Sequence, residues 1–314
     1  MTEKIDTRPW VEKYRPTNFD DIVLDPLNRK LLENIVSQNN FPNLLFYGPP
    51  GTGKTTTIIN LIDKYQEKYN QKRKGLKIHL NASDDRGIDV IRNQINQFVN
   101  TKTLFGNGIK FVILDEVDYM TKNAQQALRY LIQQYSKNIR FCLICNYISR
   151  IDTALQNEFI RLRFCQLPKK DIYKFLNIIV KKEKLNIPSI QIKGIQLRFK
   201  SDIRSMINYL QSNHNNIGII KNILTAKFLE KLIKSLKLKK KNKILLINNL
   251  CDKYNIQKKQ FIIQFVSYLV INKTKSINSE FLTSLQYIIH NNNVKDEYLI
   301  QYLLVKLEDV YKVL

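Results

Sequence analysis

Residues 44–55 read Leu-Leu-Phe-Tyr-Gly-Pro-Pro-Gly-Thr-Gly-Lys-Thr, a short apolar run followed by a glycine-rich turn. From Gly48 to Thr55 this segment fits the phosphate-loop pattern G-x-x-x-x-G-K-[ST], and a helical pattern follows over 54–68. Glycines in such a loop let backbone N–H groups face a phosphate chain, and the helix N-terminus adds the positive end of its dipole. The segment therefore predicts a strand, a phosphate loop and a helix, in that order.

Two side chains of the loop have specific predicted roles with ATP and Mg²⁺, the cofactors that we expect. Lys54 would reach the β- and γ-phosphates, and the hydroxyl of Thr55 would hold the metal. The alternative is a Gly/Pro turn with an incidental lysine, which the strand–helix context disfavours. The predicted nucleotide-binding residues of the loop are Gly48, Pro49, Pro50, Gly51, Thr52, Gly53, Lys54, Thr55 and Thr56.

Two further apolar runs end in polar side chains. Asp115 and Glu116 follow the run from Phe111, and Asn146 follows the run from Phe141. Ligands of a parallel sheet sit at the carboxyl ends of its strands, so Asp115 is expected near the metal and Glu116 near an attacking water. Asn146 could orient a water or touch the γ-phosphate. Solvated acids that cap a strand, and an asparagine that starts a turn, are the alternatives.

Strand and helix patterns alternate through the first half of the chain, which predicts an α/β domain with a parallel sheet covered on both faces. The expected strands are 44–47, 76–80, 109–114 and 140–145, and the expected helices are 54–68, 88–100, 121–135 and 150–157.

The second half lacks helix breakers, because no proline follows Pro188 and no glycine follows Gly218. Helical stripes begin after Pro168 and continue to the end. We therefore expect three domains: a nucleotide-binding α/β domain over 1–165, a small helical lid over 166–225, and an all-α collar over 226–314.

Composition narrows the class of protein. The 314 residues carry a formal net charge of +24, and residues 166–314 alone hold 27 basic and 10 acidic side chains. A polyanionic partner such as nucleic acid is one reading, and a biased Lys/Asn/Ile composition is the other. Four cysteines argue against a disulfide-stapled secreted scaffold, no apolar run is long enough to span a membrane, and the first residues lack the apolar core of a secretory leader.

Six segments in a fixed order carry a resemblance to a known family. They are Pro9-Trp-Val-Glu-Lys-Tyr-Arg-Pro16, the phosphate loop, Leu80-Asn-Ala-Ser-Asp-Asp-Arg-Gly-Ile-Asp89, Ile113-Leu-Asp-Glu-Val-Asp118, Ala124-Gln-Gln-Ala-Leu-Arg129 and Arg140-Phe-Cys-Leu-Ile-Cys-Asn146. Together they resemble a small subunit of replication factor C, the clamp loader of the AAA+ ATPase superfamily. The resemblance covers residues 9–210, and beyond about 215 only a helical pattern remains.

The resemblance implies further roles and partners. Val11 and Arg15 would line the nucleotide site, with 21–23 near the adenine, and Asn146 would sense the γ-phosphate. Arg204, in Ser201-Asp-Ile-Arg204, would reach the phosphates from the lid, although the family usually has glycine at 201. The implied DNA contacts are Arg86, Arg92 and Lys122. The implied partners are other clamp-loader subunits in a hetero-oligomeric ring, a sliding clamp and primer–template DNA, and the implied location is the nucleus.

The chain departs from the family at one functional motif. Aligned without gaps from Cys145 to Phe164, the family's Ser-Arg-Cys triplet falls on Asn157-Glu158-Phe159. The arginine of that triplet would enter the neighbouring subunit's ATP site, so Glu158 would leave that site without its finger. Arg161 could replace it only if the local backbone shifts. We therefore expect a subunit that binds its own ATP but does not activate its neighbour.

Two other functions stay open at this point. The chain could be a structural ring member whose ATP is static, or a different AAA+ ATPase that acts on protein or on Holliday-junction DNA. Cys142 and Cys145 have C-x-x-C spacing, but residues three apart on a strand face opposite sides. No zinc site is therefore expected.

Overall fold

The computed structural model describes residues 8–71, 75–82, 87–100, 108–135, 139–214, 226–237, 243–254, 256–274, 277–291 and 294–311. By compactness the chain divides into two units, and each is described by itself. Unit 1 comprises residues up to Leu185 together with Phe199–Ser212, and unit 2 comprises Asn186–Arg198 together with the chain from Asn213 onward. The three domains expected from the sequence stay a prediction.

Unit 1 is built on a five-stranded sheet in which every paired strand runs parallel to its neighbour, in the order β2-β3-β4-β1-β5. Four strands lie where the sequence places them, within one residue at each end, and β5 was not anticipated. The strands are β1 (Leu44–Tyr47), β2 (Lys77–Asn81), β3 (Lys110–Asp115), β4 (Ile139–Cys145) and β5 (Ile160–Arg163).

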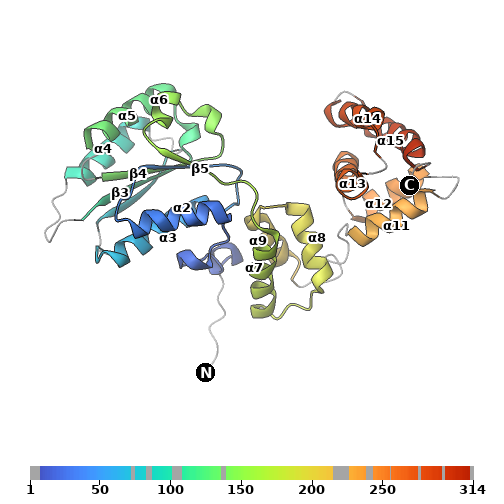
Figure 1. Ribbon diagram of the computed structural model, residues 1–314, viewed down its shortest axis with the longest axis horizontal. Coiled ribbons are helices and arrows are strands. Elements are labelled where there is room, and N and C mark those ends of the chain that lie inside the picture. The colour runs from blue at the N-terminus through green and yellow to red at the C-terminus, as the bar shows by residue number, and fades with distance from the viewer. Residues whose placement is uncertain are drawn as a thin grey trace. The chain divides into compact units, whose positions relative to one another are not determined.

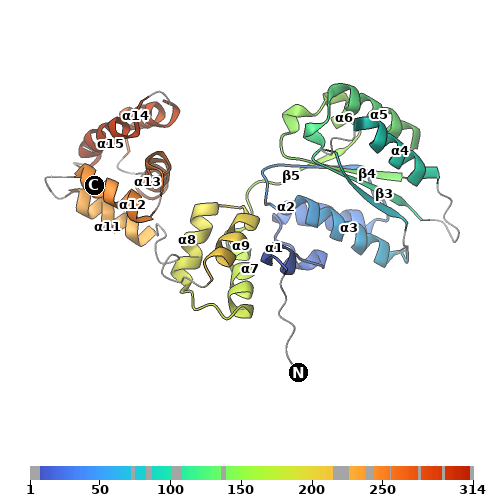
Figure 2. The same cartoon turned by 180° about the vertical axis from the view of Figure 1, so that it is seen from behind.

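Helices cover both faces of this sheet (Figure 1), which confirms the predicted fold class. One face packs against α2 (Pro26–Ser37) and α3 (Lys54–Lys68) through an apolar core. The other face packs against α4 (Gly87–Asn100), α5 (Lys122–Tyr135) and α6 (Thr153–Gln156) through a second core. The view from behind shows the same two layers (Figure 2).

The cysteines of β4 show how the sheet separates the two cores. Cys142 belongs to the core under α2 and α3, whereas Cys145 belongs to the core under α5. Burial raises the pKa of both thiols, that of Cys145 to about 12. Cys251 is buried as well, and Cys165, just after β5, is exposed. Cys142 and Cys145 therefore point to opposite faces, as residues three apart on a strand must.

The rest of unit 1 consists of short N-terminal helices and lid helices. At the N-terminus lie α1 (Trp10–Lys13) and the 3-10 helix η1 (Phe19–Asp21). The lid contributes α7 (Lys169–Lys182) and α9 (Ile203–Ser212). Short 3-10 turns η2 (Val117–Tyr119) and η3 (Ile148–Arg150) follow β3 and β4.

Unit 2 is helical throughout its described residues. An apolar core with Phe261, Phe265 and Leu307 holds the C-terminal helices together, and its ion pairs lie at the surface. Among the residues that the structure describes, no helix is both long and apolar enough to cross a membrane. The helices are α8 (Ser189–Phe199), α11 (Ala226–Lys237), α12 (Lys243–Tyr254), α13 (Lys258–Asn272), α14 (Ser279–His290) and α15 (Asp296–Tyr311).

Candidate nucleotide-binding site

The loop between β1 and α3 has a backbone that requires glycine at two close approaches. Gly48 has φ +140°, and a Cβ there would lie 1.8 Å from the carbonyl oxygen of Phe164. Gly51 has φ +74°, and a Cβ there would lie 1.8 Å from Oδ1 of Asp202. L-residues with side chains rarely adopt such angles, so these two positions are reserved for glycine. The loop is therefore packed closely against its neighbours at both glycines.

Lys54 is buried at the first position of α3, and its ammonium is bonded within the loop. Nζ donates to the carbonyl oxygens of Gly48 at 2.7 Å and Pro49 at 2.9 Å, and to Oδ1 of Asn146 at 2.9 Å. Burial lowers the pKa of Lys54, and the nearby carboxylate of Asp115 opposes that shift. A buried cation whose partners are mostly neutral oxygens is poised to pair with an anion.

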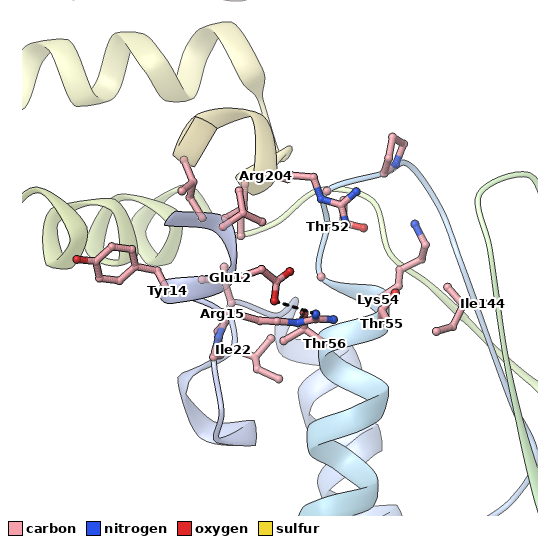
Figure 3. Close-up of a pocket in the computed structure, with 18 of the residues that line it drawn as sticks. Glu12, Tyr14, Arg15, Ile22, Thr52, Lys54, Thr55, Thr56, Ile144 and Arg204 are labelled. Atoms are coloured by element: carbon pink, nitrogen blue, oxygen red, sulfur yellow. Dashed lines mark hydrogen bonds and ion pairs between the residues drawn. The ribbon is translucent and has the colours of Figure 1, made fainter. Parts of the chain in front are cut away.

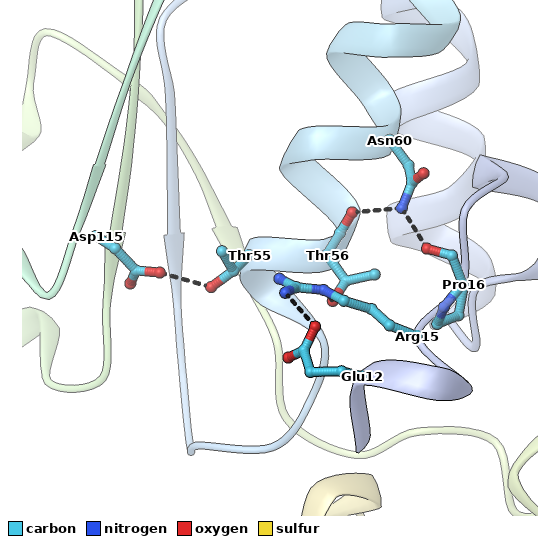
Figure 4. Close-up of polar contacts among 7 residues, drawn as sticks. All are labelled: Glu12, Arg15, Pro16, Thr55, Thr56, Asn60 and Asp115. Carbon is cyan, nitrogen blue, oxygen red and sulfur yellow. Dashed lines mark hydrogen bonds and ion pairs between the residues drawn. The ribbon is translucent and has the colours of Figure 1, made fainter. Parts of the chain in front are cut away.

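On the side of the site where a metal would bind, a residue of α3 contacts a residue of β3. Oγ1 of Thr55 donates to Oδ2 of Asp115 at 2.7 Å (Figure 4). The backbone N–H of Glu116 donates to the other carboxylate oxygen at 2.9 Å, and Glu116 has φ +58°. His79, from β2, places Nε2 3.9 Å from Oδ2 of Asp115, and burial lowers its pKa. The hydroxyl and carboxylate oxygens that Mg²⁺ prefers are thus in contact with each other.

Asn146 is positioned by a buried carboxylate that sequence reasoning did not select. Asp118 is 5% exposed, and its Oδ2 accepts from the backbone N–H groups of Asn146 at 3.3 Å and Tyr147 at 3.2 Å. The sequence feature that could have pointed to Asp118 is its position three residues after Asp115. The carboxylate fixes the turn after β4, and so directs the Asn146 amide toward Lys54.

The N-terminal segment forms another wall of the pocket. Nε of Arg15 donates to Oγ1 of Thr56 at 3.1 Å, and its guanidinium pairs with Glu12 at 3.5 Å. Figure 3 shows Glu12 and Arg15 beside the first turn of α3. The same segment is tied to the lid, because the Trp10 backbone N–H donates to Oε1 of Gln211 at 2.9 Å.

The lid forms the remaining wall. Arg204, at the start of α9, extends toward the phosphate loop (Figure 3). Phe175 from α7 and Ile207 from α9 add apolar surface. The cavity is partly open to solvent and has a volume of about 350 Å³, within the usual range for small-molecule sites.

These residues fit a nucleotide with its metal. A glycine cradle, a buried lysine and a helix N-terminus face the place of the phosphates, and Thr55 with Asp115 supplies oxygen ligands. Val11, Ile22 and Val23 line the same cavity and give it an apolar part that suits a base. The arrangement suits a nucleoside triphosphate, and Glu116 lines the same cavity beside Asp115.

The middle of unit 1 matches a family model described as "ATPase family associated with various cellular activities (AAA)", over residues 44–167. Residues 44–167 form an AAA domain. Relatives also match this chain, and their alignments are longer than the AAA domain. The chain is 46% identical over 209 residues to replication factor C subunit 3 of Schizosaccharomyces pombe, and 43% identical over 216 residues to replication factor C subunit 5 of Homo sapiens.

These alignments cover 66% and 68% of this chain, and 60% and 63% of the two relatives. The chain therefore spans less than two thirds of the length of the relatives it matches. The predicted resemblance to the small subunits of replication factor C is confirmed. Among solved structures, the RuvB Holliday junction branch migration motor of Thermotoga maritima has a TM-score of 0.51 at 14% identity, and covers 95% of this chain and 89% of its own. A likeness at this identity shows the fold alone.

The structure brings most of the predicted site residues to one cavity. Val11, Arg15, Asn146 and Arg204 line it together with 50–56, Asp115 and Glu116. Gly48 and Pro49 contribute through the carbonyls that hold Lys54. Pocket residues that the sequence did not reveal are Glu12, Tyr14, Pro16, His79, Ile144, Phe175, Ile203 and Ile207.

Of the predicted DNA contacts, Lys122 lies outside this cavity. Lys122 is exposed at the first position of α5. Arg92 lies in α4, but its side chain is outside the described residues, as is Arg86 altogether.

Glu158, at the expected finger position, is held within its own chain. Its Oε1 accepts from Nε2 of Gln133 at 2.7 Å and from Nε of Arg129 at 3.3 Å. Arg161 lies on β5 and donates to Oε1 of Gln156 at 3.2 Å.

Proposed function

We propose that this chain is an ATP-binding small subunit of a clamp loader, an ATPase that works within a hetero-oligomeric ring. The observation that carries the proposal is the single cavity in which Lys54, Thr55, Asp115, Asn146 and Arg204 meet. The 46% identity to a replication factor C subunit supports the choice of clamp loading over other work of AAA ATPases.

Each residue has a chemical task in this proposal. Lys54 and the loop amides bind the phosphates, and Thr55 and Asp115 hold Mg²⁺, which neutralises phosphate charge when bound. Glu116 orients a water for attack on the terminal phosphate, while Asn146 and Arg204 contact that phosphate. Loss of the phosphate would then change how the lid is held, so that ATP-bound and ADP-bound rings bind clamp and DNA differently.

We further propose that this subunit does not activate the site of its neighbour. An arginine finger contributes about 10³–10⁵ in rate. The carboxylate of Glu158 would instead repel a terminal phosphate, and it is already paired with Arg129. The Glu158→Arg variant in a reconstituted ring should raise the ATPase rate. An unchanged rate would mean that Glu158 is not at the finger position or that the finger is dispensable.

A second candidate function is a structural ring member whose ATP is static. The pair of Asp115 and Glu116 beside Thr55 disfavours it, because a static site needs no residue to polarise water. The Glu116→Gln variant separates the two functions. Slower ring turnover with ATP binding retained supports hydrolysis, whereas unchanged turnover supports the static role. The remaining alternative, an ATPase acting on Holliday-junction DNA, rests only on the fold that is shared with RuvB.

The proposed partners are the other clamp-loader subunits, a sliding clamp and primer–template DNA, and the proposed location is the nucleus. Lys122, with Arg86 and Arg92, is the proposed contact to DNA phosphates. Affinity purification of this chain from its own cells, with mass spectrometry of what co-purifies, tests the whole proposal. Recovery of four related ATPases and a ring-shaped clamp is expected. Recovery of the chain alone, or with unrelated proteins, would withdraw the replication role.

A further inference from the structure

The phosphate loop is bonded directly to the first turn of the lid helix α9. The backbone N–H of Ile203 donates to the carbonyl oxygen of Gly51 at 3.0 Å. The first amides of a helix have no partner within the helix, so this one is available to an outside acceptor. One acceptor is Gly51 of the phosphate loop itself, and the same N–H also lies 3.1 Å from the carbonyl oxygen of Ser201. The lid helix therefore begins on the loop that would hold the nucleotide.

Asp202 holds that helix start in place. Its Oδ1 accepts from the backbone N–H of Ser205 at 3.0 Å, and its Oδ2 accepts from Oγ of Ser205 at 2.6 Å. This is the geometry of a helix N-cap, in which a carboxylate satisfies an amide three residues on. Oδ1 also lies 1.8 Å from the place that a Cβ of Gly51 would take, so the cap packs against the bare backbone of the loop. Close packing against Gly51 and the hydrogen bonds from Ser205 therefore hold the Asp202 side chain in one place.

Ser201 anchors the other side of this turn. Its Oγ accepts from the backbone N–H of Leu167 at 3.0 Å, in the segment that connects β5 to α7. A glycine at 201 could not make this bond. The turn from Ser201 to Ile203 is therefore held at the connecting segment on one side and at Gly51 on the other.

We propose that Asp202 is a positioning residue for Arg204, and that the Gly51–Asp202 contact couples the shape of the phosphate loop to the place of the lid arginine. Arg204 is two residues from the cap and lines the nucleotide cavity, so its reach depends on where α9 begins. A loop that changes shape around phosphates moves the Gly51 carbonyl, which accepts the hydrogen bond from the first amide of α9. The start of α9 would then move with the loop. This inference rests on the proposed nucleotide binding and adds the means by which the lid detects it.

The test compares ATP and ADP affinities of the full chain and of Asp202→Ala, by calorimetry with Mg²⁺. Loss of an N-cap corresponds to about a fivefold change in an equilibrium. We expect ATP affinity to fall about fivefold and ADP affinity less than about twofold, because Arg204 acts on the terminal phosphate. Hydrogen exchange should also quicken at the Ile203 amide. Asp202→Asn keeps an acceptor for Ser205, so it should restore both the ATP affinity and the slow hydrogen exchange at Ile203.

A matched control removes a cap of the same geometry far from the pocket in sequence. Oδ1 of Asn278 accepts from the backbone N–H of Phe281 at 2.9 Å, three residues on, in α14. Asn278→Ala should leave the ATP-to-ADP affinity ratio unchanged. A ratio that is equally unchanged in Asp202→Ala would overturn the positioning role, and so would an equal shift in both variants. If the unaltered chain binds no ATP, the proposed function itself fails, which is a separate outcome.

A double-mutant cycle with Gly51→Ala is a second, independent test of the contact. The new methyl group would clash with Oδ1 of Asp202, and that clash disappears in Asp202→Ala. The loss of ATP affinity caused by Gly51→Ala should therefore be smaller when residue 202 is alanine. Strictly additive losses would show that the two positions are not coupled, against the proposal.

Discussion

Around the phosphate loop, buried polar side chains form hydrogen bonds, mostly with backbone groups, whereas the C-terminal helices bury an apolar core and keep charged pairs at the surface. Lys54, Asp118 and Thr52 are each less than 10% exposed in the first region. In the second, Lys258–Glu297 and Lys306–Glu280 join half-buried lysines to exposed glutamates. Burying polar groups costs free energy unless every partner is present, while an apolar core tolerates many substitutions. Motifs are therefore easy to recognise in the first region and absent from the second.

The largest effect is expected from the apolar core of the C-terminal helices. Phe265 is 1% exposed and stacks on Phe261 with ring centroids 5.9 Å apart. Phe265→Ala should lower the free energy of unfolding of these helices by about 3–5 kcal/mol, through lost burial and the cavity left behind. Denaturant unfolding measures this loss, and ATP affinity should change less than about twofold.

Ile263, which is 38% exposed on the same helix, supplies the control. Ile263→Ala should lower the free energy of unfolding by less than about 1 kcal/mol. Equal losses from both variants would mean that the packing of α13 does not follow its burial pattern. Loss of ATP binding in Phe265→Ala would mean that the two regions are not energetically separate.

The second-largest effect is expected in the phosphate-loop region, and it concerns ATP affinity. Lys54→Met removes an ammonium with three acceptors and should weaken ATP binding about 100-fold, because charge-assisted hydrogen bonds contribute about 1.5–3 kcal/mol. Lys64→Met, on the same helix but paired with the exposed Asp20, should change ATP affinity less than about twofold. Titration calorimetry checks both. Similar losses from the two variants would show that net charge, and not the site, governs binding.

The smallest effect concerns the surface pair in the second region. The hydrogen bond from Lys258 lowers the pKa of Glu297 below its ordinary 4.5. A carboxyl group with a lowered folded-state pKa stabilises the fold above the unfolded pKa, and loses that contribution as pH falls through the folded value. The stability difference between wild type and Lys258→Met should therefore be present at pH 7 and shrink below about pH 4.5. A difference that grows with acidity would contradict the pairing.

The same contrast explains what could be predicted from the sequence. The strand–loop–helix at 44–68 was predicted to the residue at both ends of α3, because a phosphate loop fixes local backbone as well as chemistry. Strand β5 was missed, since Ile160-Arg-Leu-Arg163 has only Leu162 buried and reads as polar. An edge strand next to β1 needs few apolar residues, so its sequence carries little signal.

Pocket residues were missed where the partner is distant in the chain. His79 lies two residues before Asn81, which pairs in register with Asp115 across β2 and β3. Phe175 and Ile207 looked like ordinary residues of helical stripes. Their place in the cavity depends on how the lid helices lie against the first turn of α3, which no local pattern encodes.

The distribution of the cysteines has a practical consequence. Cys142, Cys145 and Cys251 are buried, and burial raises the pKa of each of these thiols, so thiolate chemistry is suppressed at all three. Cys165 alone is exposed, two residues before the Leu167 amide that Ser201 holds. A maleimide dye should therefore label the natural chain at one place, on the segment that joins the sheet to the lid. Nucleotide-dependent lid motion could then be followed by fluorescence without changing any residue.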